Sequence, residues 1–181
     1  ANPIISVAEG FGQFTSSSSL GDITIDYQSG WNLVGLPLYV EDASYSSPFP
    51  GSVDGTLYSF DGGYIFESYL VPGKGYWLRF PDDGYATITG TQINDLTIGL
   101  SEGWNMVSGI TNALDVSSIQ DPDGLIIPGT VYGYSAGYSS SGVFEPGEVY
   151  WLRAYDDGEI TLSSGGLARV SGESRSLKGE A

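Results

Sequence analysis

The chain of 181 residues has no cysteine and no histidine, and only six lysines and arginines stand against 22 aspartates and glutamates. Without cysteine, neither disulfides nor thiolate metal sites can form. Without histidine, the commonest general base and metal ligand is missing. The formal net charge of −16 disfavours nucleic acid and anionic membrane surfaces, because both require a basic surface. No apolar run approaches the roughly 20 residues of a membrane span, so we expect no membrane insertion.

Glycine and tyrosine, by contrast, are abundant, with 27 and 13 residues. Together with frequent serine and threonine, this composition predicts many short strands joined by tight turns. Ile23 to Tyr27 alternates apolar and polar residues, which is typical of a half-buried strand. Only residues 112–120 suggest a single helical turn. The sequence therefore predicts an all-β protein.

One eight-residue stretch occurs twice. PGKGYWLR begins at Pro72 and PGEVYWLR begins at Pro146, an offset of 74 residues (146 − 72). Proline followed by glycine favours a tight turn, and the aromatic and branched residues that follow suit a strand. The Gly-Trp-Asn motifs at Gly30 and Gly103 recur at an offset of 73 (103 − 30). The chain therefore contains an internal duplication.

The duplication defines two repeats of about 73 residues, which we place at 23–91 and 96–164. Residues 1–22 would form an N-terminal arm, and residues 165–181 a polar tail or linker. A unit of roughly 60 to 70 residues is marginally stable without a disulfide or metal, and no spacer separates the copies. We therefore predict one duplicated β domain, a pseudo-twofold β-sandwich or barrel-like sandwich with a shared core. Two tandem mini-domains are the alternative.

Successive side chains of the repeated strand point to opposite faces of a sheet. The face that carries Tyr and Leu is predicted to be buried. The other face carries Trp77 and Arg79 in one copy and Trp151 and Arg153 in the other. These pairs either pack over a neighbouring strand, with the arginine against the ring, or form a platform for a sugar. We expect each arginine to contact a carboxylate, such as those of the downstream Asp-Asp-Gly turns, or a tryptophan face.

The other two tryptophans, Trp31 and Trp104, begin nearly continuous apolar stretches. Such stretches are typical of strands in the middle of a sheet. We therefore predict that both tryptophans pack in the core.

A binding site should break the internal symmetry, whereas core positions should recur in both copies. Aromatic residues in the loops of the first repeat meet this test, and the alternative is that they fold back onto the core, as packing usually dominates. The candidate carbohydrate-binding residues are therefore Tyr39, Tyr45, Phe49 and Tyr69, together with Trp77, Arg79, Trp151 and Arg153.

Catalytic and metal sites have little support in the sequence. A triad with histidine is impossible, and nearly all aspartates and glutamates lie in Gly-rich turns, where Asp is favoured for local hydrogen bonding. Asp121 to Gly124 is similar to a fragment of a calcium loop but lacks the later ligands. We predict no catalytic residue, no enzyme and no cofactor, and only a weak Ca²⁺ site is left open.

Two segments, GWNLVGLP from Gly30 and LVPGKGYWL from Leu70, together resemble a β module common near the C-termini of large secreted bacterial proteins. Many of those proteins are type IX secretion cargo, bound to the cell surface or active on polysaccharides. The resemblance covers roughly residues 23–164 and describes a scaffold without catalytic residues. It implies an extracellular or cell-surface accessory role beside neighbouring domains of the same polypeptide.

These observations lead us to expect a non-catalytic carbohydrate-binding module of a secreted bacterial enzyme, with a polysaccharide or cell-surface glycan as its partner. Aromatic rings would stack on sugar faces, and polar side chains would bind hydroxyls. The alternative is a structural or adhesive cell-surface spacer with no small ligand. A glycosidase with paired carboxylates comes third.

Overall fold

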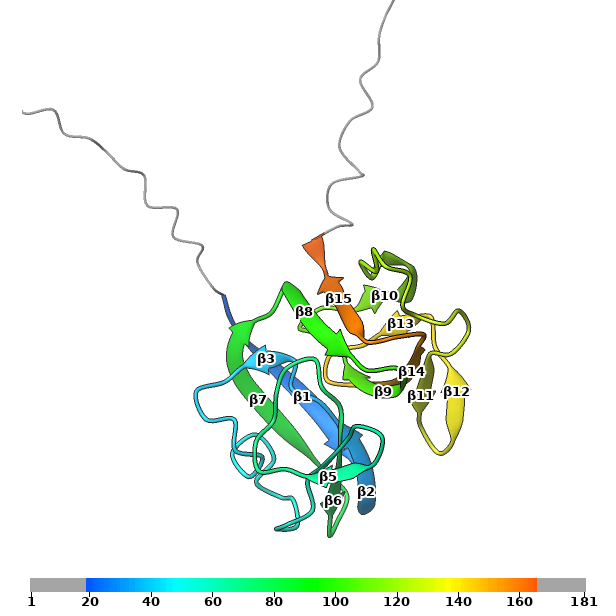
Figure 1. Ribbon diagram of the computed structural model, residues 1–181. Helices are drawn as coiled ribbons and strands as arrows, with labels where there is room; N and C mark the ends of the chain where they lie inside the picture. Colours follow the sequence, from blue (N-terminus) through cyan, green and yellow to red (C-terminus); the bar gives the residue numbers. More distant parts are fainter. Residues whose placement is uncertain (1–18, 166–181) are drawn as a thin grey trace, which may run out of the picture.

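The computed structural model describes residues 19–165, and these residues form an all-β molecule (Figure 1). Its strands fall into several sheets, and none of the described sheets closes into a barrel. Within the described range, no helix has the length and apolar character needed to cross a membrane. Most of the predicted N-terminal arm and polar tail lies outside the described residues.

The first half of the chain contributes two antiparallel sheets. In one of them, β1 and β3 flank β7, and the other has the order β2-β6-β4-β5. The strands are β1 (Leu20–Tyr27), β2 (Gly30–Val34), β3 (Leu38–Tyr39), β4 (Tyr58–Phe60), β5 (Tyr64–Phe66), β6 (Tyr76–Phe80) and β7 (Gly84–Gln92).

The second half has a four-stranded sheet of order β12-β11-β14-β9 and two strand pairs, β15-β8 and β10-β13. The predicted helical turn is confirmed as a short 3-10 helix, η1 (Val116–Ser118). The strands are β8 (Asp95–Leu100), β9 (Gly103–Ser108), β10 (Leu114–Asp115), β11 (Tyr132–Tyr134), β12 (Tyr138–Ser140), β13 (Val143–Phe144), β14 (Val149–Ala154) and β15 (Gly158–Ser163).

The predicted burial of the Tyr-Leu face is confirmed in both copies of the repeated strand. Tyr76 and Leu78 in β6 are fully buried, and Tyr150 and Leu152 in β14 are almost fully buried. The opposite face of each four-stranded sheet points away from these buried side chains, because neighbouring residues of a strand alternate between faces.

The predicted burial of Trp31 and Trp104 is wrong. β2 and β9 lie at the ends of their sheets, and the two tryptophans are 49% and 40% exposed. The apolar stretch that suggested a central strand is buried only further along, at Val34 and Leu36. Each tryptophan lies on the face of its strand that points away from the core.

The buried apolar side chains form two clusters, one drawn from residues 25–88 and the other from residues 93–162. The predicted single shared core is therefore not what the structure contains. The physical reason lies in the residues that meet between the halves. At the Pro-Gly turns these are glycines and a serine, which bring the two backbones close together and leave little room for side chains that would merge the two clusters.

Backbone hydrogen bonds join the halves in a reciprocal way. The Gly35 N–H donates to the Gly147 carbonyl at 3.1 Å, and the Ser108 N–H donates to the Gly73 carbonyl at 3.0 Å. A Cβ on Gly35 would lie 2.2 Å from the Ser108 Cβ, so no larger residue fits there without movement. The contact between the halves thus depends on close backbone approach.

The two Pro-Gly turns predicted from the sequence present these glycines. Gly73 and Gly147 have φ of +83° and +73°, the left-handed conformation that a type II turn requires and glycine tolerates best. A Cβ on Gly73 would lie 2.5 Å from Ile98, and one on Gly147 would lie 2.6 Å from Ile25. Each turn is therefore packed tightly against the opposite half of the molecule.

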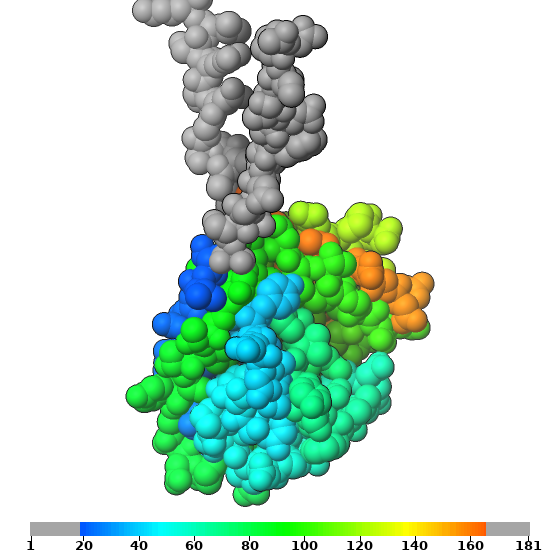
Figure 2. Space-filling view, turned by 90° about the vertical axis from the view of Figure 1, so that its left-hand side faces the viewer, coloured from blue at the N-terminus to red at the C-terminus, as the bar shows by residue number. Residues whose placement is uncertain are grey.

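A long loop follows β3 and closes the first core. In the space-filling view of Figure 2, this loop (cyan) lies across the side of the first half that faces the viewer. Phe49 lies in the loop at 0% exposure, and its ring meets Phe80 edge-on with centroids 6.1 Å apart. The loop thus supplies part of the core.

Candidate functional site

Two aromatic clefts lie on the four-stranded sheets, on the faces opposite the buried Tyr-Leu faces. The first cleft has a volume of about 470 Å³ and is lined by Trp31, Tyr58, Tyr64 and Trp77. The register of the sheet brings these side chains together, because Tyr58 lies directly across from Trp77. Cross-strand neighbours of this kind have side chains on the same face.

The second cleft has a volume of about 410 Å³. Its sheet pairs Tyr132 with Trp151 in the same way that the first sheet pairs Tyr58 with Trp77. Four of its lining residues come from the second half and one from the first half: Trp104, Tyr132, Tyr138, Trp151 and Phe60.

Aromatic contacts between the halves join the two clefts. The Phe60 ring of β4 meets Trp151 with centroids 5.0 Å apart, and the Tyr134 ring of β11 meets Trp77 at 5.6 Å. Both contacts are edge-on, a favoured geometry for aromatic pairs. Each half therefore places an aromatic side chain against the repeated tryptophan of the other half.

The rings of the clefts are not coplanar. Their neighbouring pairs meet at interplanar angles between 48° and 88°. The contacting rings therefore do not form one flat surface. Both volumes fall within the range of roughly 300–1,000 Å³ that is usual for small-molecule sites.

The two arginines lie beside the clefts. Arg79 is directly across from Trp31 in the β2–β6 ladder, and Arg153 is across from Trp104 in the β9–β14 ladder. Both side chains are exposed. The predicted arginine contacts are wrong for the part of the chain that the structure describes, where the one ion pair and the one cation–π contact both involve Lys74.

The carboxylates expected to pair with the arginines bind backbone groups. Asp83 accepts a hydrogen bond from the Ser29 N–H at 2.7 Å, and Asp157 accepts one from the Glu102 N–H at 2.8 Å. These aspartates therefore fix the turns that precede β2 and β9.

Two of the predicted site residues serve the fold. Phe49 is fully buried, as described above. Tyr45 is half-buried and packs against the first core, and its hydroxyl accepts a hydrogen bond from the Gly55 N–H at 2.8 Å. Phe49 and Tyr45 therefore fold back onto the core and do not form a binding surface.

Tyr39 and Tyr69 are 48% and 65% exposed, but neither lines a cleft. Tyr39 pairs with Thr91 at the edge of the three-stranded sheet, and Tyr69 forms an isolated antiparallel β-bridge with Ser44. The structure therefore does not gather the four loop aromatics into one surface.

Seven of the cleft aromatics were not among the sequence candidates, because recurrence was taken as a sign of core packing. The sequence did contain a signal for these residues: aromatic residues of the first repeat recur in the second at a nearly constant offset. A binding surface can be duplicated along with the fold. The missed residues are Trp31, Tyr58 and Tyr64, their counterparts Trp104, Tyr132 and Tyr138, and Phe60.

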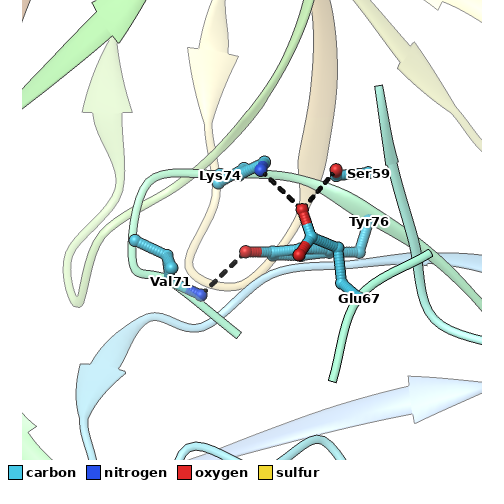
Figure 3. A network of polar contacts seen from close by, with 5 residues as sticks. All are labelled: Ser59, Glu67, Val71, Lys74 and Tyr76. Carbon is cyan, nitrogen blue, oxygen red and sulfur yellow. Dashed lines mark hydrogen bonds and ion pairs between the residues drawn. The ribbon is translucent and has the colours of Figure 1, made fainter. Parts of the chain in front are cut away.

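A polar network lies next to the first Pro-Gly turn (Figure 3). The Glu67 carboxylate accepts hydrogen bonds from the Ser59 hydroxyl at 2.7 Å and from Lys74 at 2.9 Å, and these two bonds lower its pKa. The Tyr76 hydroxyl accepts the Val71 N–H at 2.9 Å, and burial raises the pKa of Tyr76 to about 12. The hydrogen bonds of Glu67 tie β4 to the turn, and burial keeps Tyr76 neutral.

The calcium-like segment is a turn stabilised by its own aspartate. Asp121 accepts hydrogen bonds from the N–H groups of Leu125 and Ile126 at 2.8 and 2.9 Å. Among residues 19–165, no group of three or more carboxylates is placed to hold a metal ion.

No family model matches the chain, and no curated protein or solved structure shows significant similarity to it. The resemblance to secreted bacterial modules therefore stays a prediction. The clefts and their chemistry are the remaining guide to function.

Proposed function

We propose that the protein is a non-catalytic carbohydrate-binding module and that the two aromatic clefts are its sugar sites. One observation carries the proposal. All four tryptophans of the chain line the clefts, and none belongs to either buried apolar cluster. Tryptophan and tyrosine offer a large apolar face, which suits stacking on a sugar ring.

Polar groups at the rims would bind sugar hydroxyls. Arg79 and Arg153 lie across from cleft tryptophans, and a guanidinium offers five N–H donors. No aspartate or glutamate of the described region lines either cleft. Glycoside hydrolysis normally needs two flanking carboxylates, so this composition supports binding without catalysis.

We further propose that the two halves are internal repeats related by a pseudo-twofold axis. Gly35 contacts Gly147 while Ser108 contacts Gly73, and these pairs exchange under the sequence offsets of 73 and 74 residues. The partners of the two Pro-Gly turns, Ile25 and Ile98, exchange in the same way. On this basis, the two clefts are copies of one site.

The setting we propose is extracellular, as an accessory domain of a secreted bacterial enzyme. The resemblance of the repeated motifs to modules of secreted proteins supports this setting. The acidic chain, with a net charge of −16, fits a glycan partner better than nucleic acid.

A spacer or adhesive module on the cell surface is the second candidate. The lining of both clefts is dominated by aromatic ring atoms, which would also accept apolar side chains of a neighbouring protein domain. Binding to isolated glycans separates the two functions, because a spacer would show none.

The test is a pull-down of the purified protein on immobilised plant, algal and microbial polysaccharides, combined with a glycan array. We expect retention on at least one neutral polysaccharide. The double variant Trp31→Ala/Trp104→Ala should abolish retention, whereas Tyr39→Ala/Tyr69→Ala should retain it. The second variant is a matched control, because it removes two exposed aromatics outside the clefts.

If the wild-type protein bound none of the glycans, this result would overturn the proposal in favour of the spacer. Loss of binding in the Tyr39/Tyr69 control, with normal binding by the tryptophan variant, would place the site on the loops. Circular dichroism and a thermal melt of each variant would exclude unfolding as the cause.

A further inference from the structure

Only a few aromatic rings separate the two clefts. Tyr64 lines the first cleft and contacts Phe60 at 5.5 Å between centroids, and Phe60 lines the second cleft. On the other side, Tyr138 lines the second cleft and contacts Tyr134 at 5.0 Å, which in turn meets Trp77 of the first. The clefts are therefore neighbours within one continuous aromatic surface.

The hairpins of the two halves produce this continuity. β4 lies beside β9 of the other half, and Phe60 stands at the end of β4, where the chain turns into β5. Tyr134 stands at the corresponding end of β11. Each hairpin thus extends the aromatic lining of its own sheet as far as the other half.

The relative orientation of the rings restricts the physical form of the ligand. A crystalline polysaccharide presents a flat face, and coplanar rings are needed to lie against it. The contacting rings are tilted by 48° to 88° relative to one another, so they do not lie in such a plane. A single, separate chain can instead meet rings of different orientation in turn.

The charge of the molecule restricts the chemistry of the ligand. The chain has 22 acidic and six basic residues, so its long-range field repels polyanions. Arg79 and Arg153 lie across from the cleft residues Trp31 and Trp104, and their donors also suit neutral hydroxyls. An uncharged sugar chain meets both the apolar lining and the acidic surroundings.

We propose that one extended, uncharged polysaccharide chain lies across both clefts and is held at two points. This inference rests on the proposed carbohydrate-binding function and specifies its ligand. Binding at the second cleft becomes intramolecular once the first is occupied. The gain over a short ligand can reach roughly 10²- to 10⁴-fold when the chain spans both sites without strain.

The experiment is isothermal titration calorimetry of the whole chain with β-1,4-linked glucan, mannan and xylan oligosaccharides from disaccharides to octasaccharides, and with soluble long-chain forms of each. We expect disaccharides of the preferred series to bind weakly at two sites. Beyond a threshold length, the stoichiometry should fall to one ligand and the affinity should rise at least about a hundredfold.

Single-cleft variants add an independent readout. Trp31→Ala or Trp104→Ala alone should lower affinity for the long chain to that of the short ligand and leave one site for disaccharides. Tyr85→Ala, which removes an exposed aromatic from β7 outside both clefts, is the matched control and should change neither value.

Three results would overturn the inference while leaving the proposed function intact. They are equal affinities for short and long chains at two sites, binding to microcrystalline cellulose but not to soluble chains, and a preference for anionic polygalacturonate. Failure of every oligosaccharide and polysaccharide to bind would instead overturn the proposed function itself.

Discussion

At the scale of single residues, the two tyrosines of the repeated strand show why that sequence recurs. Each hydroxyl accepts a hydrogen bond from the backbone just before a Pro-Gly turn, Tyr76 from Val71 and Tyr150 from Glu145, both at 2.9 Å. The ring of each tyrosine is buried. A core residue in each repeat therefore also holds the turn that contacts the other half.

Tyr76→Phe should destabilise the protein by about 1 kcal/mol. The substitution keeps the buried ring but leaves the partly buried Val71 N–H without its acceptor, and an unsatisfied donor costs roughly that much or more. Urea denaturation followed by tryptophan fluorescence would measure the change. Tyr85→Phe, on an exposed ring, is the control, and equal stability of the two variants would contradict the role of the hydroxyl.

The Glu67 network should make part of the stability dependent on pH. Hydrogen bonds from Ser59 and Lys74 lower the folded-state pKa of Glu67 below its ordinary value of 4.5. The stabilisation is therefore present above about pH 4.5 and is lost as the pH falls from there through the folded-state pKa. Glu67→Gln should remove this acid-dependent loss.

Denaturation curves collected across that pH range would test the network. We expect the wild-type protein to lose more stability on acidification than Glu67→Gln does. Glu159→Gln, at an exposed carboxylate, serves as the matched control and should follow the wild-type profile. Parallel profiles for wild type and Glu67→Gln would show that the network contributes nothing to acid sensitivity.

At the scale of elements, the Pro-Gly turns act as the joint between the two halves. Their left-handed glycines place Gly73 against Ile98 and Gly147 against Ile25. Backbone hydrogen bonds complete each contact. Each copy of the repeated stretch therefore forms both a core strand of its own half and the turn that packs against the other half.

Gly35→Ala should destabilise the joint by about 1–3 kcal/mol, the usual cost of overpacking a tight contact. The new Cβ would lie 2.2 Å from the Ser108 Cβ. Gly99→Ala is the control, because nothing lies within 4 Å of a Cβ at that position. Thermal and chemical denaturation would measure both variants.

A double-mutant cycle locates the effect. In the background of Ser108→Gly, which removes the clashing atoms, Gly35→Ala should cost less than it does alone. We expect a coupling energy of about 1 kcal/mol between the two positions. Additive effects would show that the halves do not meet at this contact.

Strands and turns were the part of the fold that the sequence predicted well. Alternation along Tyr76 to Phe80 and the Pro-Gly and Asp-Gly signals are local, and the structure agrees with the buried face and the turns they predict. The position of a strand within its sheet is not local. The run after Trp31 reads as a central strand, yet β2 is at the end of its sheet, and Val34 and Leu36 are buried in an apolar cluster that also contains Phe49.

At the scale of the whole molecule, the candidate site was harder to predict than the strands and turns. The two halves have separate cores, but they share one aromatic surface that only their contact creates. A lone repeat shows which side chains alternate outward, but not that Phe60 meets Trp151 across the joint. The sequence offers no local pattern that separates the buried loop residue Phe49 from the exposed Tyr39 and Tyr69. Recurrence alone could not separate packing from a duplicated surface.

The isolated first half, residues 20–92, should form a homodimer. It has its own apolar cluster and contains Gly35, Gly73 and Ile25, which supply one side of each reciprocal contact. A second copy can therefore replace the missing half in an isologous arrangement. Sedimentation velocity should show a dimer that dissociates when Gly73→Ala is introduced, and a stable, cooperatively folded monomer would contradict this expectation.

The most direct test of the central claim, that the twin clefts are the glycan site, is tryptophan fluorescence during titration with a polysaccharide that the protein retains. All four tryptophans line the clefts, so their emission reports on the site without any label. We predict a saturable change in emission together with protection from quenching by acrylamide. Saturation of binding in calorimetry with unchanged emission and unchanged quenching would place the ligand elsewhere and contradict the account.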